Sequence, residues 1–348
     1  MKKLLTLLLC LAMLATLCAC GSGTDTTESA ATTTETASAT TAETTAEDSA
    51  ETTGDGKTYT VGICQLTQHV ALDAATQGFI DVLTEELGDS VTIVNQNASG
   101  DIPTCATIVN GFVSDGVDLI LANATPALQA AAAATEDVPI LGTAVTEYGV
   151  ALDLSDFDGT VGGNISGTSD LAPLDQQAAM ITELFPEAKT AGILYCSAEA
   201  NSVYQAEVVK AALEDAGLTV NIYTFADSND VSSVTASACD ESDVIYIPTD
   251  NTAASCAEAI NNVAEPAGVP IVAGEEGICT GCGVATLSID YYELGRTTGQ
   301  MAVRILRDGE DISTMPIEYF PDPVKEYNPA ICEALGVTVP DDYVAIAE

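Results

Sequence analysis

Two segments of the chain repeat one pattern, in which a short apolar strand leads into a polar turn and an alanine-rich helix. The first copy begins at Asp118 and the second at Asp243, and a Val-Pro-Ile strand follows each of them, at Val138 and Val269. Runs rich in β-branched residues favour buried strands, and a proline ends a strand and begins a turn. Such strand and helix units are typical of a parallel α/β sheet.

The repeat extends upstream of these two segments. The strand Val61–Gln65 corresponds to Ala191–Tyr195, and Val91–Val94 corresponds to Thr219–Ile222. Two similar α/β lobes in tandem explain this correspondence, so we predict two doubly wound parallel-sheet lobes. Open α/β sheets bind ligands at the carboxyl edge of their strands, and two such edges that face each other form a cleft. We expect the functional site in this cleft.

The last part of the chain does not repeat. A helix that follows Asp290 and ends near Leu306 has no counterpart at the end of the first lobe, so the chain is expected to cross back there. A segment from Pro316 onward is expected to cross again, which gives a three-crossing hinge. The predicted lobe 1 comprises residues 58–168 and 291–311, and the predicted lobe 2 comprises residues 169–290 and 312–348.

The N-terminus has the features of an export signal. Two lysines precede the apolar run Leu4–Leu17, which is too short for an ordinary membrane span. The segment Leu17–Gly21 resembles the lipobox of bacterial lipoproteins, which implies cleavage before Cys20 and lipidation of that cysteine. We therefore predict a signal peptide at residues 1–20 and a mature chain anchored to the outer face of the bacterial cell membrane. Cleavage nearby to give a soluble secreted protein is the alternative.

Residues 21–57 are rich in Thr, Ala, Ser and Glu and contain almost no large apolar side chain. Such a composition cannot bury enough surface to offset the conformational entropy of the chain. We predict a disordered tether.

The composition argues against several classes of function. The formal net charge of −43 leaves too few cations to displace counterions from nucleic acid. The single histidine, His69, excludes a site with two histidine ligands, and phosphate-binding, dinucleotide-binding and serine-nucleophile motifs are absent from the sequence. Cys64 and His69 could form a nucleophile pair in principle, but nothing in the sequence orients them. We therefore predict no enzyme activity, cofactor, metal or nucleic acid partner.

The pair Cys279 and Cys282 has the spacing of a redox or metal-binding motif. A lone pair of this kind supplies only half the ligands of an all-cysteine zinc site. We favour a structural disulfide or buried free thiols over a functional site.

Several separate motifs recur in the order found in one known family. They are Ala71–Asp73, Ala124–Ala127, Thr143–Thr146, Ser169–Leu171, Glu199–Ser202, Pro248–Thr252 and Ser288–Arg296. The chain resembles the ABC-transporter substrate-binding lipoproteins of the tryptophan/tyrosine type. The resemblance implies a type I periplasmic-binding-protein fold, three hinge crossings, closure on an amino-acid-like ligand and its delivery to a permease. The chain departs from the family's usual pattern at Gln68–Val70 and at Thr146–Tyr148.

The chemistry of such a ligand indicates which side chains would hold it. An ammonium group needs an acidic partner, for which Asp250 is the first candidate and Asp290 or Asp170 the next. A carboxylate is stabilised by helix N-termini, which places Thr125 and Thr146 against it. The remaining contacts follow from the resemblance: Gln68, His69, Glu147, Ser169, Asn201, Ser202 and Asn251.

Simpler roles compete with ligand contact at several of these positions. Asp250 and Asn251 could only cap a helix. Asp290 could bind the backbone of the hinge, and Tyr291 and Tyr292 are expected to pack at the hinge. For the whole protein, we predict a solute-binding lipoprotein of an ABC importer that binds an aromatic amino acid. The alternative is a surface receptor of the same fold for a nucleoside, a sugar or a signal molecule.

Overall fold

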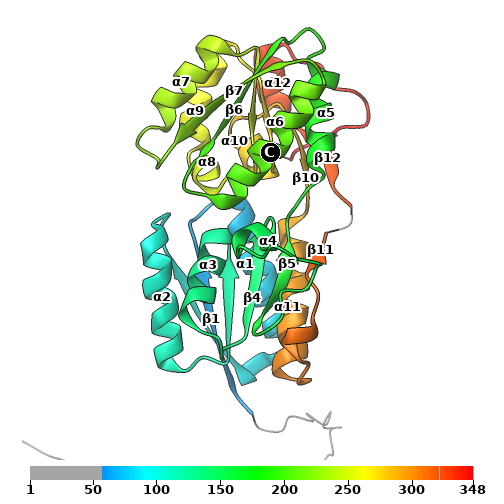
Figure 1. Ribbon diagram of the computed structural model, residues 1–348. Coiled ribbons are helices and arrows are strands. Elements are labelled where there is room, and N and C mark those ends of the chain that lie inside the picture. Colours follow the sequence, from blue (N-terminus) through cyan, green and yellow to red (C-terminus); the bar gives the residue numbers. More distant parts are fainter. Residues whose placement is uncertain (1–56, 321, 348) are drawn as a thin grey trace, which may run out of the picture. The chain divides into compact units, whose positions relative to one another are not determined.

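The structure is a computed structural model that describes residues 57–320 and 322–347. The predicted signal peptide, the predicted lipidation site Cys20 and nearly all of the predicted tether lie outside the described residues. Lobe 1 alternates strands and helices along the chain (Figure 1): β1 (Tyr59–Gln65), α1 (Val70–Leu87), β2 (Val91–Asn97), α2 (Ile102–Asp115), β3 (Leu119–Asn123), α3 (Thr125–Ala134), β4 (Ile140–Val145), α4 (Tyr148–Ala151) and β5 (Ile165–Ser169).

Lobe 2 follows with the same alternation. Its elements are α5 (Leu174–Leu184), β6 (Thr190–Cys196), α6 (Ala200–Asp215), β7 (Thr219–Phe225), α7 (Val231–Glu241), β8 (Val244–Ile247), α8 (Asn251–Ser255), α9 (Ala257–Ala267), β9 (Ile271–Ala273), α10 (Glu276–Cys282) and β10 (Ala285–Ser288). The chain then adds α11 (Tyr291–Leu306), β11 (Glu318–Tyr319), β12 (Val324–Tyr327), α12 (Pro329–Leu335) and β13 (Val344–Ala345).

The two lobes have the same central strand order. Among the described residues it is β2-β1-β3-β4-β5 in lobe 1 and β7-β6-β8-β9-β10 in lobe 2. All of these neighbouring strands pair in parallel. The internal repeat in the sequence is therefore a repeat of topology, and the predicted two-lobed, doubly wound α/β fold is confirmed.

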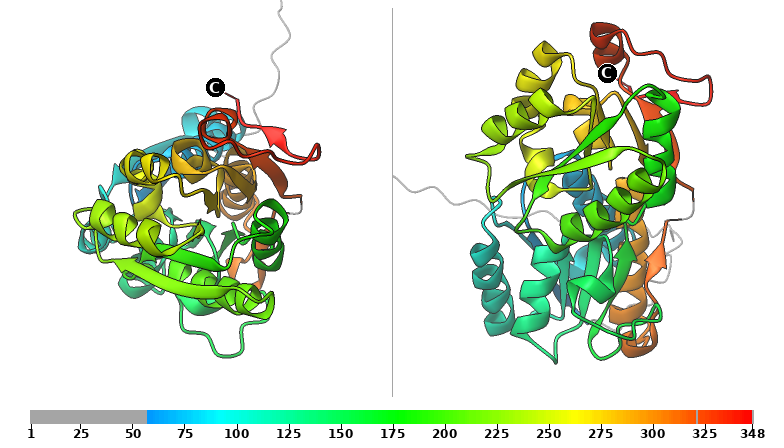
Figure 2. Two further views of the ribbon diagram at one scale, coloured as in Figure 1. Left: turned by 90° about the horizontal axis from the view of Figure 1, so that it is seen from above. Right: turned by 45° about the horizontal axis from the view of Figure 1, so that its top comes forward.

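The central strands are buried on both faces, as continuous apolar runs favour. In β3, Leu119 and Leu121 pack toward α1 and α11, whereas Ile120 and Ala122 pack toward α2 and α3. This alternation follows from the two-residue period of a strand. Helices accordingly cover both faces of each sheet (Figure 2).

Helix α11 returns to lobe 1 and packs closely against α1. A Cβ atom at Gly295 would lie 2.0 Å from the carbonyl oxygen of Ala75, and one at Gly78 would lie 2.1 Å from the carbonyl oxygen of Tyr292. Only glycine permits the two helix backbones to approach this closely.

The chain passes between the lobes three times, as predicted. The first crossing follows β5, the second lies between β10 and α11, and the third lies between β11 and β12. The predicted boundary at residue 311 is wrong, because β11 pairs in parallel with β5 and extends the sheet of lobe 1. Ile312 and Met315 also pack in the core of lobe 1. The third crossing therefore begins after Tyr319.

Residues 54–348 belong to one compact unit, to which all the described residues belong. None of the described helices combines the length and the apolar character that a membrane span needs.

Candidate functional site between the lobes

The strand order of each lobe reverses at one point, which is where open α/β sheets bind ligands. In lobe 1 this point lies between β1 and β3, and in lobe 2 it lies between β6 and β8. A hydrogen bond joins the loops that leave these strands: Nε2 of His69, after β1, lies 3.2 Å from Oδ1 of Asn251, after β8. Helix α6 of lobe 2 also packs against α3 and α4 of lobe 1. The two ligand-binding edges therefore meet.

Most of the predicted site residues are buried where the lobes meet or at the hinge. The buried ones are Thr125, Thr146, Ser169, Asp170, Asn201, Ser202, Asp250 and Asn251. His69 and Glu147 are partly buried, and Gln68 and Asp290 are exposed. Gln68 lines a hollow of about 560 Å³ formed by lobe 1 alone, together with residues such as Asn95 and Asn97.

Asp250 caps helix α8, which confirms the simpler of the two roles considered for it. Oδ1 accepts a hydrogen bond from the backbone N–H of Ala253, and Oδ2 accepts one from the N–H of Cys196, both at 2.7 Å. Burial, with the nearby charge of Glu199, raises the pKa of Asp250. Both oxygens of Asp250 therefore already have partners in the protein.

Glu199 was not among the predicted site residues, although it begins the motif that contains Asn201. Glu199 directly precedes α6, and its side chain accepts hydrogen bonds at the start of α8. The donors are the backbone N–H and side-chain Nδ2 of Asn251, at 3.1 and 2.6 Å, and the N–H and hydroxyl of Thr252, at 2.9 and 2.8 Å. A second carboxylate thus stabilises the positive end of α8.

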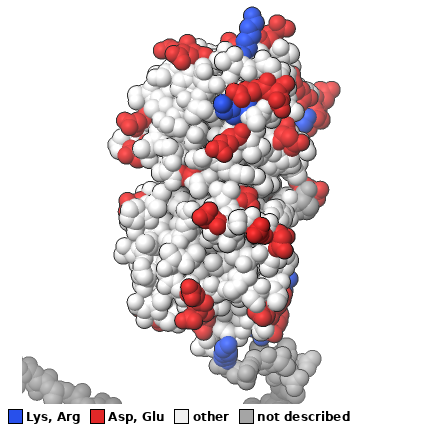
Figure 3. Space-filling model, viewed as in Figure 1, with Lys and Arg blue, Asp and Glu red and all other residues white. Residues whose placement is uncertain are grey.

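Asp170 differs from Asp250 because one of its oxygens has no partner. Oδ2 accepts a hydrogen bond from the hydroxyl of Tyr291 at 3.0 Å, whereas Oδ1 is buried and unpaired within the described residues. Burial raises the pKa of Asp170, and the nearby hydroxyl groups of Thr146 and Tyr291 oppose this effect, although the Thr146 hydroxyl makes no hydrogen bond to Oδ1. None of the ion pairs among the described residues involves Asp170, Glu199, Asp250 or the buried Glu275. On the molecular face seen in Figure 1, basic side chains are far fewer than acidic ones, as Figure 3 shows.

Three other buried polar atoms without partners among the described residues belong to residues that end a strand, follow one or begin the next helix. They are Nδ1 of His69, Oδ1 of Asn201 and Oδ1 of Asn123, the last residue of β3. A buried polar atom without a partner costs about 1–3 kcal/mol. A bound molecule that offers hydrogen-bond donors would remove this cost. Asn123 was not predicted, although it ends the first copy of the repeated strand.

Helix α3 begins at the site without a side-chain cap. Its N-cap residue is Ala124, whereas α4, α8, α10 and α11 are each capped by an acidic residue of their own. Ala124 has a φ angle of 92°, and Ala144, in β4, has one of 50°. Strained backbone of this kind clusters at binding sites. The free N–H groups and the helix dipole make the start of α3 suited to an anion such as a carboxylate.

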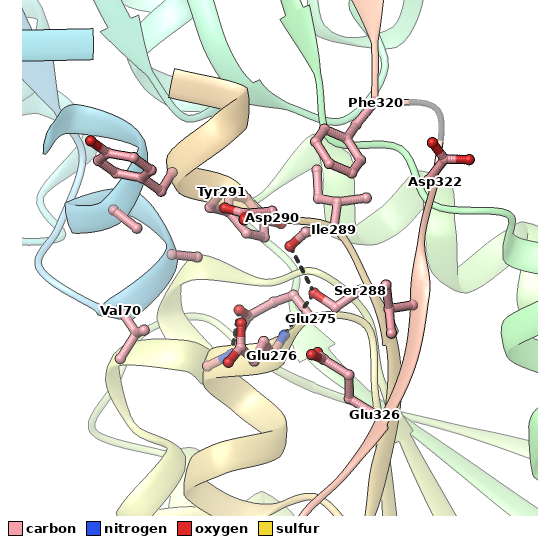
Figure 4. A pocket seen from close by; sticks show the side chains of 15 residues that line it. Val70, Glu275, Glu276, Ser288, Ile289, Asp290, Tyr291, Phe320, Asp322 and Glu326 are labelled. Carbon is pink, nitrogen blue, oxygen red and sulfur yellow. Dashed lines mark hydrogen bonds between the residues drawn. The ribbon is translucent and has the colours of Figure 1, made fainter. Parts of the chain in front are cut away.

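A second cavity, of about 510 Å³, lies at the hinge (Figure 4). It is lined by the starts of α1 and α10 and by the second and third crossings, and it contains Glu276, Asp290 and Glu326. Asp290 caps α11 by accepting a hydrogen bond from the N–H of Glu293 at 3.0 Å. Burial, with the charges of Glu276 and Asp290, raises the pKa of Glu326 to about 7. Asp290 therefore lines the hinge cavity and caps α11 there.

None of the hydrogen bonds among the described residues joins a cysteine to His69. Cys64 is buried, and its Sγ lies 4.0 Å from the carbonyl oxygen of Cys105. Cys279 and Cys282 are buried free thiols in α10, and both donate to backbone carbonyl groups of their own segment. Burial strongly raises the pKa of both thiols, which makes them poor nucleophiles. Within the described residues, no group of His, Cys, Asp and Glu has the arrangement of a metal site.

This chain is similar to known proteins both in sequence and in structure. A tyrosine-binding protein from Clostridioides difficile (strain R20291) is 37% identical over 267 residues, which are 75% of this chain and 76% of that protein. An ABC domain from Streptococcus pneumoniae in complex with L-Trp is 34% identical, with a TM-score of 0.78, and the match covers 82% of this chain and 97% of that one.

A ligand-free, open structure is also similar to this chain. It is a substrate-binding protein with adhesive properties from Clostridium difficile, 36% identical, with 83% of this chain and 99% of that chain covered. Its TM-score is only 0.63, although its identity is higher than that of the L-Trp complex. This chain therefore superposes better on the L-Trp complex than on the ligand-free structure.

The family itself is established by a match over almost the whole described chain. Residues 60–348 match the family described as ABC transporter substrate binding protein. This family and the relatives above are binding proteins, so the chain is not an enzyme. The chain thus belongs to the ABC transporter substrate-binding protein family.

Proposed function

We propose that this substrate-binding protein takes up an aromatic amino acid between its lobes and delivers it to an ABC permease. The observation that carries this proposal is the buried carboxyl group of Asp170, which has an unpaired oxygen and no basic partner. A buried carboxylate is costly unless it is paired with a cation. The ammonium group of an amino acid is a cation that would arrive only with the ligand.

The start of α3 supports a site for the ligand's carboxylate. Thr125 is its first residue, and Thr146 directly follows β4, the strand that pairs with both β3 and β5. Asp170 follows β5, so the proposed ammonium site is adjacent to Thr146, after β4, and the start of α3, after β3, lies one strand further along the sheet. Their order suits the two charged groups that share one Cα atom in an amino acid.

The names of the relatives support an aromatic side chain. One is called a tyrosine-binding protein, and another was solved with L-Trp. Asn201 and Ser202, at the start of α6, and Glu147, which caps α4, were also predicted as contacts, and the packing of α6 against α4 supports including them in the proposed site.

Calorimetry tests the proposal directly. The mature protein would be titrated with tyrosine, tryptophan, phenylalanine, leucine, a nucleoside and a sugar. We expect tight binding of at least one aromatic amino acid and a rise in the melting temperature that grows with its concentration. Binding of only the nucleoside or the sugar would favour the receptor alternative, and binding of none of the aromatic amino acids would refute the proposal.

We further infer that Cys20 is lipidated, that residues 1–20 are removed and that residues 21–57 tether the lobes to the outer face of the membrane. The apolar run and the lipobox-like segment support this inference. Cells that express the wild-type chain or Cys20→Ala would be labelled with a fatty acid and fractionated. We expect label and membrane association in the wild type only. Crosslinking of the ligand-loaded protein to a permease subunit would test delivery.

A further inference from the structure

The contacts around Asn251 fix the orientation of its side-chain amide. Nδ2 lies 2.6 Å from Oε2 of Glu199, a carboxylate that also accepts hydrogen bonds from Thr252. The reverse orientation would place the amide oxygen against that carboxylate, which is unfavourable because both are acceptors. Oδ1 of Asn251 therefore faces Nε2 of His69.

This orientation determines the tautomer of His69. An amide oxygen can only accept, so Nε2 of His69 must carry the proton of the 3.2 Å hydrogen bond. Burial lowers the pKa of His69, although the contact with Asn251 and the charges of Glu199 and Asp73 oppose this effect. In the neutral ring, Nδ1 is then an acceptor. It is buried and has no partner within the described residues.

His69 and Asp170 follow two strands that are three positions apart in the sheet of lobe 1. His69 follows β1 and Asp170 follows β5, and the strands β3 and β4 lie between them. Three strand spacings amount to roughly 14 Å. This span is comparable to an extended aromatic amino acid with a hydrogen bond at each end. An ammonium group at Asp170 would therefore direct the tip of the side chain toward His69.

We propose that Nδ1 of His69 accepts a hydrogen bond from the polar group at the tip of the ligand's side chain. This group is the phenol O–H of tyrosine or the indole N–H of tryptophan, so His69 selects against phenylalanine. The inference rests on the proposed binding of an aromatic amino acid. Its physical basis is that a site built to bond a ligand donor discriminates strongly against the analogue that lacks the donor.

Two substitutions separate the two ring nitrogens. His69→Gln places an amide N–H near the position of Nε2 and nothing at Nδ1, so it keeps the contact with Asn251 and removes the acceptor. His69→Asn places an amide oxygen near the position of Nδ1 and removes the contact with Asn251. We expect His69→Gln to weaken tyrosine binding roughly tenfold to a hundredfold more than phenylalanine binding. His69→Asn should weaken both but keep the preference for tyrosine.

Nitrogen NMR of the ring gives a second readout, since the chain has one histidine. In tag-free protein with labelled histidine, we expect a protonated Nε2, an unprotonated Nδ1, and a shift of the Nδ1 signal with tyrosine but not with phenylalanine. A protonated Nδ1 in the tyrosine complex, or an equal tyrosine-to-phenylalanine affinity ratio in wild type and His69→Gln, would overturn the inference and leave the proposed function intact. Failure of the wild type to bind any aromatic amino acid would instead overturn the proposed function, and this inference with it.

Discussion

The hydroxyl group of Tyr291 donates a hydrogen bond of 3.0 Å to Oδ2 of Asp170, and this contact ties the second crossing of the hinge to the first. Tyr291 begins α11, which packs on lobe 1, while Asp170 directly follows the last strand of the lobe 1 repeat. One oxygen of Asp170 is therefore held by the hinge, and the other is unpaired. This arrangement orients the carboxyl group for a ligand.

Replacing Asp170 by Asn should remove the charge that pairs with the ligand's ammonium group. Breaking a buried, hydrogen-bonded charge pair costs about 2–4 kcal/mol, so we predict a loss of affinity of roughly 30- to 1,000-fold. The melting temperature of the ligand-free protein should not fall, because the substitution also removes a buried charge. Calorimetry and thermal unfolding measure the two effects.

The control for this substitution is Asp290→Asn. Asp290 was predicted as an alternative ammonium partner, but it is exposed and caps α11. An asparagine can keep the cap, so affinity should be unchanged. Equal losses in both variants would contradict the role assigned to Asp170.

Glu199→Ala should destabilise lobe 2. The carboxylate accepts hydrogen bonds from two backbone N–H groups at the start of α8, and Asn251 is buried. Leaving such donors unsatisfied costs about 1–3 kcal/mol each, so we predict a loss of about 3 kcal/mol in the free energy of unfolding. Glu207→Ala, on the exposed face of α6, the helix that follows Glu199, should change it by less than about 0.5 kcal/mol. Urea unfolding of both variants tests this contrast.

The fold could be predicted because the sequence repeats its strand and helix pattern twice, and each copy alone specifies the same local topology. The sequence placed Asp250 first among the three acidic candidates for the ammonium group, but it could not show which carboxyl group keeps an unpaired oxygen. Asp250 and Asp290 both precede helices and cap them, which leaves the third candidate, Asp170, with the unpaired oxygen.

Two features depended on contacts that are distant in the sequence. Glu199 contacts residues more than 50 positions away, so no local pattern revealed its role. The boundary of lobe 1 was placed too early because the strand Glu318–Tyr319 has only two residues and is defined by its pairing with β5.

The close approach of α1 and α11 predicts that Gly295→Ala is strongly destabilising. The new methyl group would meet the backbone of Ala75, which cannot move without shifting a helix. We predict a loss of about 3 kcal/mol in the free energy of unfolding. The matched control is Gly111→Ala, at an exposed position of α2 where an added Cβ meets nothing within 4 Å. It should stabilise the protein by about 1 kcal/mol, since alanine is the better helix former. A similar effect of both substitutions in urea unfolding would contradict the tight packing of α1 against α11.

The acidic groups at the hinge and the site predict that the ligand-free protein loses stability as the pH rises. Burial raises the pKa of Glu275 and Glu326 to about 7 from an ordinary value of 4.5, and it also raises that of Asp250. Between these values the native state holds protons that the unfolded state has released, so the free energy of unfolding falls from about pH 4.5 to above pH 7. Urea unfolding at pH 5, 6, 7 and 8 measures this slope.

Glu326→Gln tests the source of that pH dependence. Glu326 lies with Glu276 and Asp290 at the hinge cavity, where no basic residue is among the described lining residues. The neutral amide removes one ionisation from the native state, so the variant should show a smaller slope and exceed the wild type in stability at pH 8 but not at pH 5. Glu333→Gln, on the exposed side of α12, is the control and should retain the slope of the wild type. If stability instead rose with pH in the wild type, the buried carboxyl groups would have to be ionised and paired in the native protein. The lack of a basic partner at Asp170 would then no longer support an ammonium site there.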